Sequence, residues 1–119
     1  MKIKNIEIDF DFLDADDVAN FENELKKVVQ KSNENKSERL EYSEALRKEC
    51  ETVEEFFDNM FGEGTSKEIF KGKMNLKEHI EAFQEIVNEK NRKQAELQSL
   101  YNKYAPNRQQ RRKRKWIFY

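Results

Sequence analysis

The sequence predicts a mainly α-helical protein: a short N-terminal β-strand or hairpin, a three- to four-helix bundle, and a disordered or extended basic C-terminal tail. Only three glycines and one proline occur in 119 residues, and this scarcity argues against a many-turned β fold. Charged residues make up 39% and hydrophobic residues 36%, as expected for helices that each bury one narrow stripe. The chain therefore divides into a helical domain with its N-terminal strand, residues 1–107, and a basic, aromatic tail, residues 108–119.

Apolar and acidic residues alternate near the N-terminus with the period of a half-buried strand. The apolar positions of this alternation are Ile6, Ile8, Phe10 and Phe12. Ile3 can begin a short partner strand, with Lys4 and Asn5 as the turn between the two. We expect no strand after this segment.

The first helix is expected to begin after Asp14, a good N-cap, because Asp16 and Asp17 then lie in the first turn, where carboxylates favour the helix dipole. Its predicted buried stripe recurs at helical spacing: Val18, Phe21, Leu25, Val28 and Val29. The polar residues 31–37 are its predicted end.

A longer helix is predicted from Ser37 to Phe61, because apolar residues recur there at spacings of three and four. They are Leu40, Tyr42, Leu46, Cys50, Val53, Phe56, Phe57, Met60 and Phe61. Gly62 follows directly, where a helix-ending glycine with positive φ belongs.

A short helical turn is expected around Ile69 and Phe70, followed by a helix that Asn75 and Glu78 open as a capping box. The predicted stripe of this last helix is Leu76, Ile80, Phe83, Val87, Leu97, Tyr101 and Tyr104. Pro106 is expected to stop it. Residues from the three longer helices are predicted to share one core: Phe21, Leu46, Val53, Phe57, Phe83 and Val87.

The glycine-containing loop before this last helix has to be compared with a phosphate-binding loop. Such a loop needs a buried strand before it and a Lys-Ser/Thr pair at the start of a helix. Here the preceding residues are predicted to be helical, and the order over residues 62–67 is Gly-x-Gly-Thr-Ser-Lys. Gly62, Gly64 and Thr65 are therefore interpreted as a structural loop, in which Thr65 or Ser66 caps the next short helix.

The acidic run at residues 9–17 supplies oxygen donors of the kind that Ca²⁺ prefers. An EF-hand loop would need an oxygen donor at position 13, where the chain has Leu13, and a glycine at position 14, where Asp14 stands. We expect these carboxylates to face water or to cap the helix, and we predict no metal site.

No group of residues in the sequence predicts catalysis. His79 is the only histidine, and no serine or second thiol offers it a recognisable partner for a nucleophilic pair. We expect His79 to be a partly buried surface residue and Cys50 to be packed rather than reactive. The sequence thus predicts a protein that is not an enzyme and has no cofactor.

The charge distribution separates an acidic body from a basic tail. Residues 108–115 carry six of the 23 basic residues and no acid, which leaves 17 basic against 24 acidic residues elsewhere, a formal charge of −7. The predicted partner-binding residues are Arg108, Arg111, Arg112, Lys113, Arg114, Lys115 and Trp116. Cations beside aromatic rings suit phosphate contact and base stacking, but an acidic protein surface or a purely solubilising role would suit the same residues.

The compartment is predicted from what the chain lacks. Cys50 stands alone, so no intramolecular disulfide can form and a reducing interior is the natural environment. No apolar run approaches the roughly 20 residues that cross a bilayer, and the segment from Met1 to Asp11 has no signal-peptide core. We expect a soluble, cytoplasmic protein without a membrane partner.

Three stretches resemble a family of short proteins encoded by phages and prophages of Gram-positive bacteria. They are "IEIDFDFLDADD" at the start, "FFDNMFGEGTSKEIFKGKMNL" in the middle and "YAPNRQQRR" near the end. The Phe-Gly-Glu-Gly-Thr core at residues 61–65, followed by Lys67, Ile69 and Phe70, is the most specific part of the resemblance.

The resemblance implies a role in phage tail morphogenesis, inside the bacterial host cell. It implies a helical tail assembly chaperone that binds the tape-measure and tail-tube proteins. Separately, the opposite charges of the body and the tail predict that residues 108–119 mediate self-association into a homo-oligomer or docking to a partner. The alternative is a phage-encoded regulatory module whose basic tail binds nucleic acid or a host protein. Steep salt dependence of binding would be typical of the second class, and co-purification with tail proteins of the first.

Overall fold

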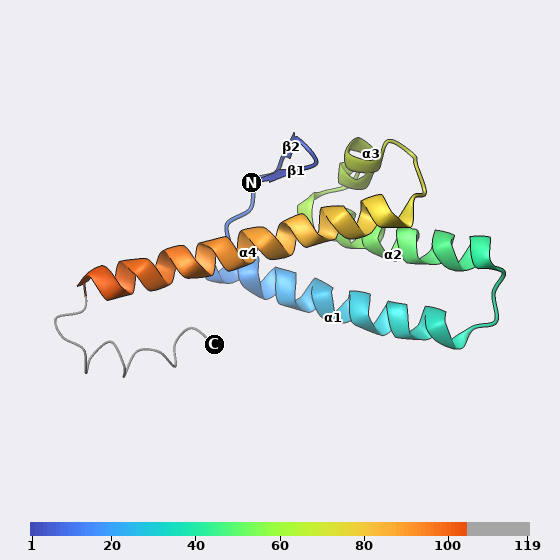
Figure 1. The fold of residues 1–119 in the computed structure, drawn as a ribbon, viewed down its shortest axis with the longest axis horizontal. Helices are drawn as coiled ribbons and strands as arrows, with labels where there is room; N and C mark the ends of the chain where they lie inside the picture. Colours follow the sequence, from blue (N-terminus) through green and yellow to red (C-terminus); the bar gives the residue numbers. More distant parts are fainter. Residues whose placement is uncertain (105–119) are drawn as a thin grey trace.

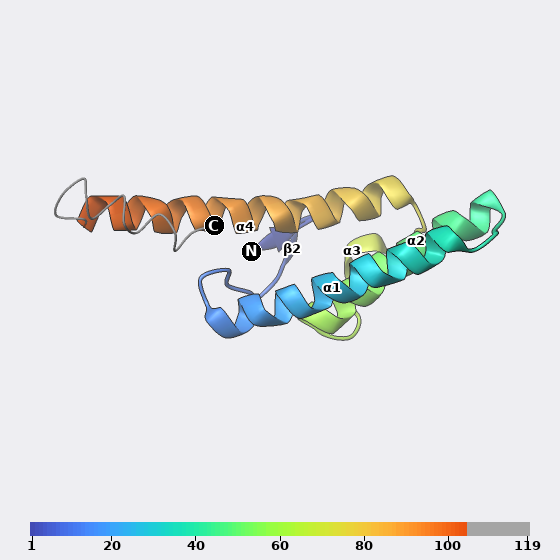
Figure 2. The ribbon, with the colours of Figure 1, turned by 90° about the horizontal axis from the view of Figure 1, so that it is seen from below.

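The computed structural model describes residues 1–104, so the predictions for Pro106 and for the basic tail lie outside the described residues. Within this range a two-stranded hairpin precedes four helices (Figure 1): β1 Lys2–Ile3, β2 Ile6–Glu7, α1 Ala15–Ser37, α2 Tyr42–Phe61, α3 Thr65–Phe70 and α4 Leu76–Tyr104. The predicted fold class, a short hairpin followed by a helical bundle, is confirmed. The molecule is elongated, 58 × 31 × 22 Å, with α4 in one layer and α1 and α2 in the other (Figure 2).

The N-terminal hairpin forms with the predicted turn. Both turn residues have positive φ, 48° for Lys4 and 69° for Asn5, as a two-residue turn of the mirror-image type requires. The second strand ends at Glu7, earlier than the alternation suggests, although Ile8 and Phe12 are still buried. Within residues 1–104 the sheet has no third strand that could pair with the chain beyond Glu7.

The helix starts of the α1–α2 hairpin agree only in part with the prediction. Asp14 is the N-cap of α1, because its carboxylate accepts a hydrogen bond from the backbone N–H of Asp17 at 3.0 Å. The second long helix begins at Tyr42 and not at Ser37, since Ser37 is the last residue of α1 and residues 38–41 connect the two helices.

The polar segment at residues 31–37 ends α1 as predicted, because the helix stops at Ser37, the last residue of that segment. Its polar side chains bond to α2: the Asn35 amide donates to a carboxylate oxygen of Glu49 and to the hydroxyl of Thr52, both at 3.2 Å. Contacts with a neighbouring helix thus hold a stretch that has few apolar residues of its own.

The glycine loop ends α2 as predicted but caps α3 in another way. Gly62 has φ 111°, and its N–H donates to the carbonyl of Asp58 at 3.0 Å. Gly64, not Thr65 or Ser66, occupies the N-cap position of α3. The acceptor comes from α2 instead, because the Asp58 carboxylate accepts from the Ser66 backbone N–H at 2.8 Å and from its hydroxyl at 2.9 Å.

The buried face of α4 is turned by one residue from the predicted stripe. The Asn75 side chain caps the helix by accepting from the Glu78 N–H at 3.0 Å, as expected. The buried residues are His79, Ala82 and Ile86. Ile80, predicted to be buried, is 55% exposed, since one residue rotates a helix by about 100°. Three more members of the predicted stripes are exposed: Val29, Tyr42 and Tyr104.

Aromatic rings fill the core where α1, α2, α3 and the N-terminal segment meet. Phe56 and Phe57 have at most 1% exposed surface, and their rings contact those of neighbouring elements, mostly edge to face. Of the predicted core, Phe21 and Phe57 are buried in this cluster, and Val53 and Phe83 pack against it. Leu46 and Val87 are only half-buried and do not belong to it.

Candidate functional site

The most enclosed group of polar side chains surrounds His79 in the first turn of α4. The ring has no exposed surface, so the prediction of a partly buried surface residue is wrong. Its Nδ1 lies 2.7 Å from the carbonyl oxygen of Asn75, and its Nε2 lies 2.7 Å from a carboxylate oxygen of Glu54 on α2. The Phe70 ring of α3 stacks on the imidazole, with centroids 3.7 Å apart and planes 5° apart.

This geometry joins α2, α3 and α4 around one buried ring. Both ring nitrogens face an acceptor, so both hydrogen bonds form when the ring carries two protons or when Glu54 carries one. Cys50, one turn before Glu54, is fully buried. Burial, and next the Glu54 carboxylate, raise the pKa of the Cys50 thiol, which keeps it protonated and unreactive. Because neither His79 nor Cys50 has exposed surface, a substrate cannot reach them.

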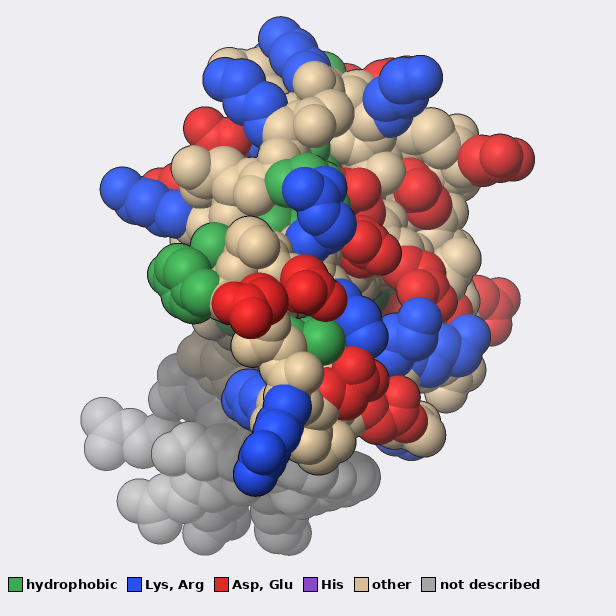
Figure 3. All heavy atoms as spheres, turned by 90° about the vertical axis from the view of Figure 1, so that its right-hand side faces the viewer, with side chains coloured by type: hydrophobic (Ala, Val, Ile, Leu, Met, Phe, Trp, Pro, Cys, Tyr) green, Lys and Arg blue, Asp and Glu red, His purple; other side chains and the backbone are tan. Residues whose placement is uncertain are grey.

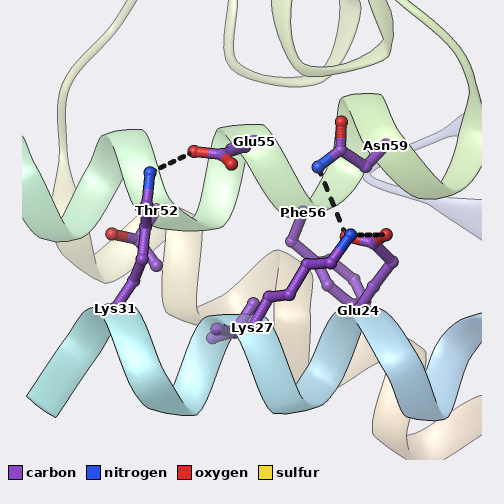
Figure 4. Close-up of a pocket in the computed structure, with 8 residues that line it drawn as sticks. Glu24, Lys27, Lys31, Thr52, Glu55, Phe56 and Asn59 are labelled. Carbon is purple, nitrogen blue, oxygen red and sulfur yellow. Dashed lines mark hydrogen bonds and ion pairs between the residues drawn. The ribbon is translucent and has the colours of Figure 1, made fainter.

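A second polar group lies between α1 and α2 (Figure 4). The Glu24 carboxylate accepts from Lys27 at 2.9 Å and from the Asn59 amide at 3.3 Å, while Lys31 donates to Glu55 at 2.7 Å. The space among these side chains is only about 10 Å³, enough for a single water. The group therefore fastens α1 to α2 and does not form a ligand site.

An open groove lies between the first turns of α2 and α4, and we call it the α2–α4 groove. It is lined mainly by hydrophobic side chains, Tyr42, Leu46, Met74, Leu76 and Ile80, with the polar side chains of Asn75, Lys77 and Glu81 beside them. Tyr42 is 79% exposed and Ile80 55%. Figure 3, which faces the end of the molecule where α2 begins, shows hydrophobic side chains at the surface bordered by acidic and basic ones.

The sequence assigned four of the five hydrophobic groove residues to helical stripes that were expected to be buried, all except Met74. Two features expose them. Tyr42 is the first residue of α2, directly after the non-helical connection at residues 38–41, and its side chain is 79% exposed. Ile80 turns outward because His79 occupies the inner position of α4. Nothing in the sequence around His79 and Ile80 predicts that the histidine is buried and the isoleucine exposed.

The other residues singled out from the sequence have structural roles or lie outside the described range. All seven predicted partner-binding residues are in the segment from 105 onward, which the structure does not describe: Arg108, Arg111, Arg112, Lys113, Arg114, Lys115 and Trp116. The loop residues Gly62, Gly64 and Thr65 connect α2 to α3. In the acidic run, Asp11 and Asp14 accept hydrogen bonds from backbone N–H groups. Residues 1–104 contain no cluster of His, Cys, Asp and Glu side chains that could hold a metal ion.

The comparisons with known proteins give one match. The model of DUF6673, a family of unknown function, matches residues 4–115. The chain belongs to this family. No curated protein and no solved structure matches it. Among the helices of residues 1–104, none combines the length and the apolar character that crossing a membrane requires.

Proposed function

We propose that this DUF6673 protein is a non-enzymatic phage tail-morphogenesis protein, a tail assembly chaperone that binds the tape-measure and tail-tube proteins in the host cytoplasm. The α2–α4 groove is the observation that carries the proposal. Tyr42 and Ile80 expose apolar surface side by side with Leu46 and Leu76. Contiguous apolar patches on small proteins mark interaction sites, and a groove between helices accepts the apolar face of another helix.

The phage context comes from the sequence resemblance, and the groove supplies a binding mode for it. A chaperone of this kind would bind apolar helix faces that the tape-measure protein presents before the tail forms around it. The side chains of Lys77 and Glu81 beside the groove carry opposite charges, which can orient a bound helix without closing the groove to water. No catalytic residue is needed for such a role.

Co-expression with the tail proteins of the same phage genome tests the proposal. Tagged wild-type protein should capture the tape-measure or tube protein, and Ile80→Glu should abolish capture. Val29→Glu is a matched control, because Val29 on α1 is 54% exposed, almost the same as Ile80, and does not line the groove. Equal capture by both variants, or none by the wild type, would contradict the proposal.

The second candidate function, a regulatory module that binds nucleic acid or a host protein, rests on the six cations and the aromatic residues of the tail. A chain truncated after residue 107 separates the two. The regulatory function replaces the chaperone on two results. The full chain binds DNA with an affinity that falls steeply with salt, and truncation removes this binding. In addition, neither the full chain nor its Ile80→Glu variant captures a tail protein.

A further inference from the structure

A pocket with a volume of about 340 Å³ lies between the first turns of α1 and the middle of α4, and we call it the α1–α4 pocket. Its polar lining consists of Glu22, Lys90 and Gln94. The hydrophobic lining comes from α1 and the residues before it: Phe12, Val18, Phe21 and Leu25. Since a water molecule occupies ~30 Å³ in the liquid, the pocket has room for a large side chain.

The segment that leads into the α1–α4 pocket is acidic. Residues 7–25 contain eight acidic residues and no lysine or arginine: Glu7, Asp9, Asp11, Asp14, Asp16, Asp17, Glu22 and Glu24. Asp16 and Glu22 are exposed, and neither side chain forms a hydrogen bond or ion pair with another residue of the described range. The edge of the pocket therefore presents carboxylates that are free to bind cations.

The end of the sequence has the complementary composition. Residues 108–115 carry six cations and no acid, and four apolar or aromatic residues follow them: Trp116, Ile117, Phe118 and Tyr119. A basic segment that ends in aromatic side chains matches, in both charge and polarity, a hydrophobic pocket beside an acidic segment.

The helix α4 ends close enough for the chain to return to its own pocket. From Lys90, in the pocket lining, to Tyr104 the helix advances about 21 Å, at 1.5 Å per residue. The twelve residues from Tyr104 to Trp116 span up to about 40 Å when extended, about twice that distance. A connection of this length holds the segment near its own pocket at an effective concentration in the mM range, an advantage that a second copy lacks.

We propose that residues 116–119 dock into the α1–α4 pocket of the same chain, while the cations of residues 108–115 lie against the acidic segment of residues 7–25. The order of the two contacts agrees with the path. Because α4 continues past the first turn of α1, a segment that returns from its end meets this acidic turn before it reaches the pocket (Figure 2).

The cations of α4 along this path are largely offset by neighbouring acids. Arg92 pairs with Glu89 and Glu96, and Lys93 pairs with Glu96. Lys90 shares the lining of the pocket with Glu22. The excess of eight acids in residues 7–25 therefore dominates the attraction on the basic segment.

The fluorescence of Trp116 tests the proposal in the full chain, because Trp116 is the only tryptophan. Its emission should lie at shorter wavelength than in a peptide of residues 108–119, and acrylamide should quench it severalfold less. The double variant Asp16→Lys with Glu22→Lys should lose most of this protection, with unchanged helical circular dichroism. The matched control is Glu44→Lys with Glu51→Lys, the same change of charge in the first turn and at an exposed position of α2, and it should keep the protection.

Three results overturn the proposal. They are a Trp116 that is quenched as readily in the full chain as in the peptide, equal quenching in the two double variants, and protection that disappears as the full chain is diluted, which would indicate docking between copies. The inference goes beyond the proposed function and does not rest on it. The Ile80→Glu variant should keep Trp116 protected, so loss of tail-protein capture and loss of this docking are separate results.

Discussion

The two ends of the α1–α2 hairpin are held together by different interactions. At the end near the glycine loop, Phe21 of α1 meets Phe56 of α2 edge to face, with ring centroids 6.0 Å apart. At the other end, Asn35 of α1 bonds to Glu49 and Thr52 of α2. The free energy gained by burying apolar surface is proportional to the buried area and does not depend on direction, whereas a hydrogen bond needs a specific partner in the right geometry. The same pair of helices is thus stabilised by buried aromatic surface at one end and by directional hydrogen bonds at the other.

The largest effect is expected at the aromatic end. Phe57→Ala should lower the free energy of unfolding by roughly 3–5 kcal/mol, because it leaves a cavity where a ring with no exposed surface stood. Urea denaturation measures the loss. Val29→Ala is the control, since that side chain is 54% exposed and should change stability little. A loss near zero for Phe57→Ala would mean that the aromatic cluster does not hold the fold.

His79 combines both kinds of interaction, and His79→Leu separates them. Leucine keeps apolar contact with Phe70 but removes the ring's hydrogen bonds to Glu54 and to the Asn75 carbonyl, which still accepts from the backbone N–H of residue 79. We expect a loss of roughly 1–3 kcal/mol, the cost of unsatisfied polar groups. Thermal unfolding monitored by circular dichroism measures it. A variant as stable as the wild type would show that apolar contact alone fastens the start of α4.

At the polar end, Asn35→Ala should destabilise the protein by about 1 kcal/mol, since the two bonds that it removes are partly buried. Hydrogen exchange should show faster opening of residues 31–37, while the aromatic end exchanges as before. Asn33→Ala is the control, because Asn33 is an exposed residue of the same segment. Equal effects of the two substitutions would contradict a role for the Asn35 bonds.

Gly62→Ala tests how the aromatic end of α2 stops. An added Cβ would meet no atom within 4 Å, so the cost comes only from the positive φ of 111°. We expect about 1 kcal/mol or somewhat more, measured by urea denaturation. A stability equal to that of the wild type would show that the helix can end at residue 62 without this conformation.

The smallest effect is expected for the exposed ion pair of Lys31 and Glu55. The hydrogen bond from Lys31 to Glu55, and then their charge attraction, raise the pKa of Lys31. A raised pKa adds stability that is present at neutral pH and is lost as alkaline pH deprotonates the lysine. Because solvent screens this half-exposed pair, Lys31→Met should cost no more than about 0.5 kcal/mol. A larger loss at neutral pH would mean that the polar end depends on charge rather than on Asn35.

Features fixed by neighbouring residues could be predicted from the sequence, and features that depend on distant ones could not. The Lys4 and Asn5 turn, the Asp14 cap and the Gly62 terminator each involve partners within four residues. The inner position of His79 depends on Glu54, 25 residues away. The candidate site follows from such distant contacts, because the groove opens only where α4 has turned His79 inward.

The sequence placed the end of α1 in its polar segment, but the exact last residue could not be predicted for the same reason. Residues 31–37 have no apolar stripe, and their helix depends on Glu49 and Thr52 of the next element. Similarly, the cap of α3 is the Asp58 carboxylate of α2, while the local hydroxyls of Thr65 and Ser66 had suggested a cap within the loop. Hydrophobic periodicity predicts which side of a helix packs against apolar partners, but it does not predict hydrogen bonds between polar side chains of different helices.

Because Cys50 is buried, the rate at which a reagent modifies this single thiol measures how often the helices separate. A reagent can modify it only after the elements packed on α2 have separated, because its side chain has no exposed surface and burial raises the pKa of the thiol. When reclosing is faster than the chemical step, the rate of labelling follows the population of open molecules. When modification is faster, the rate becomes that of opening itself. A partner helix bound in the α2–α4 groove would hold α2 and α4 together and so lower the rate at which Cys50 is labelled.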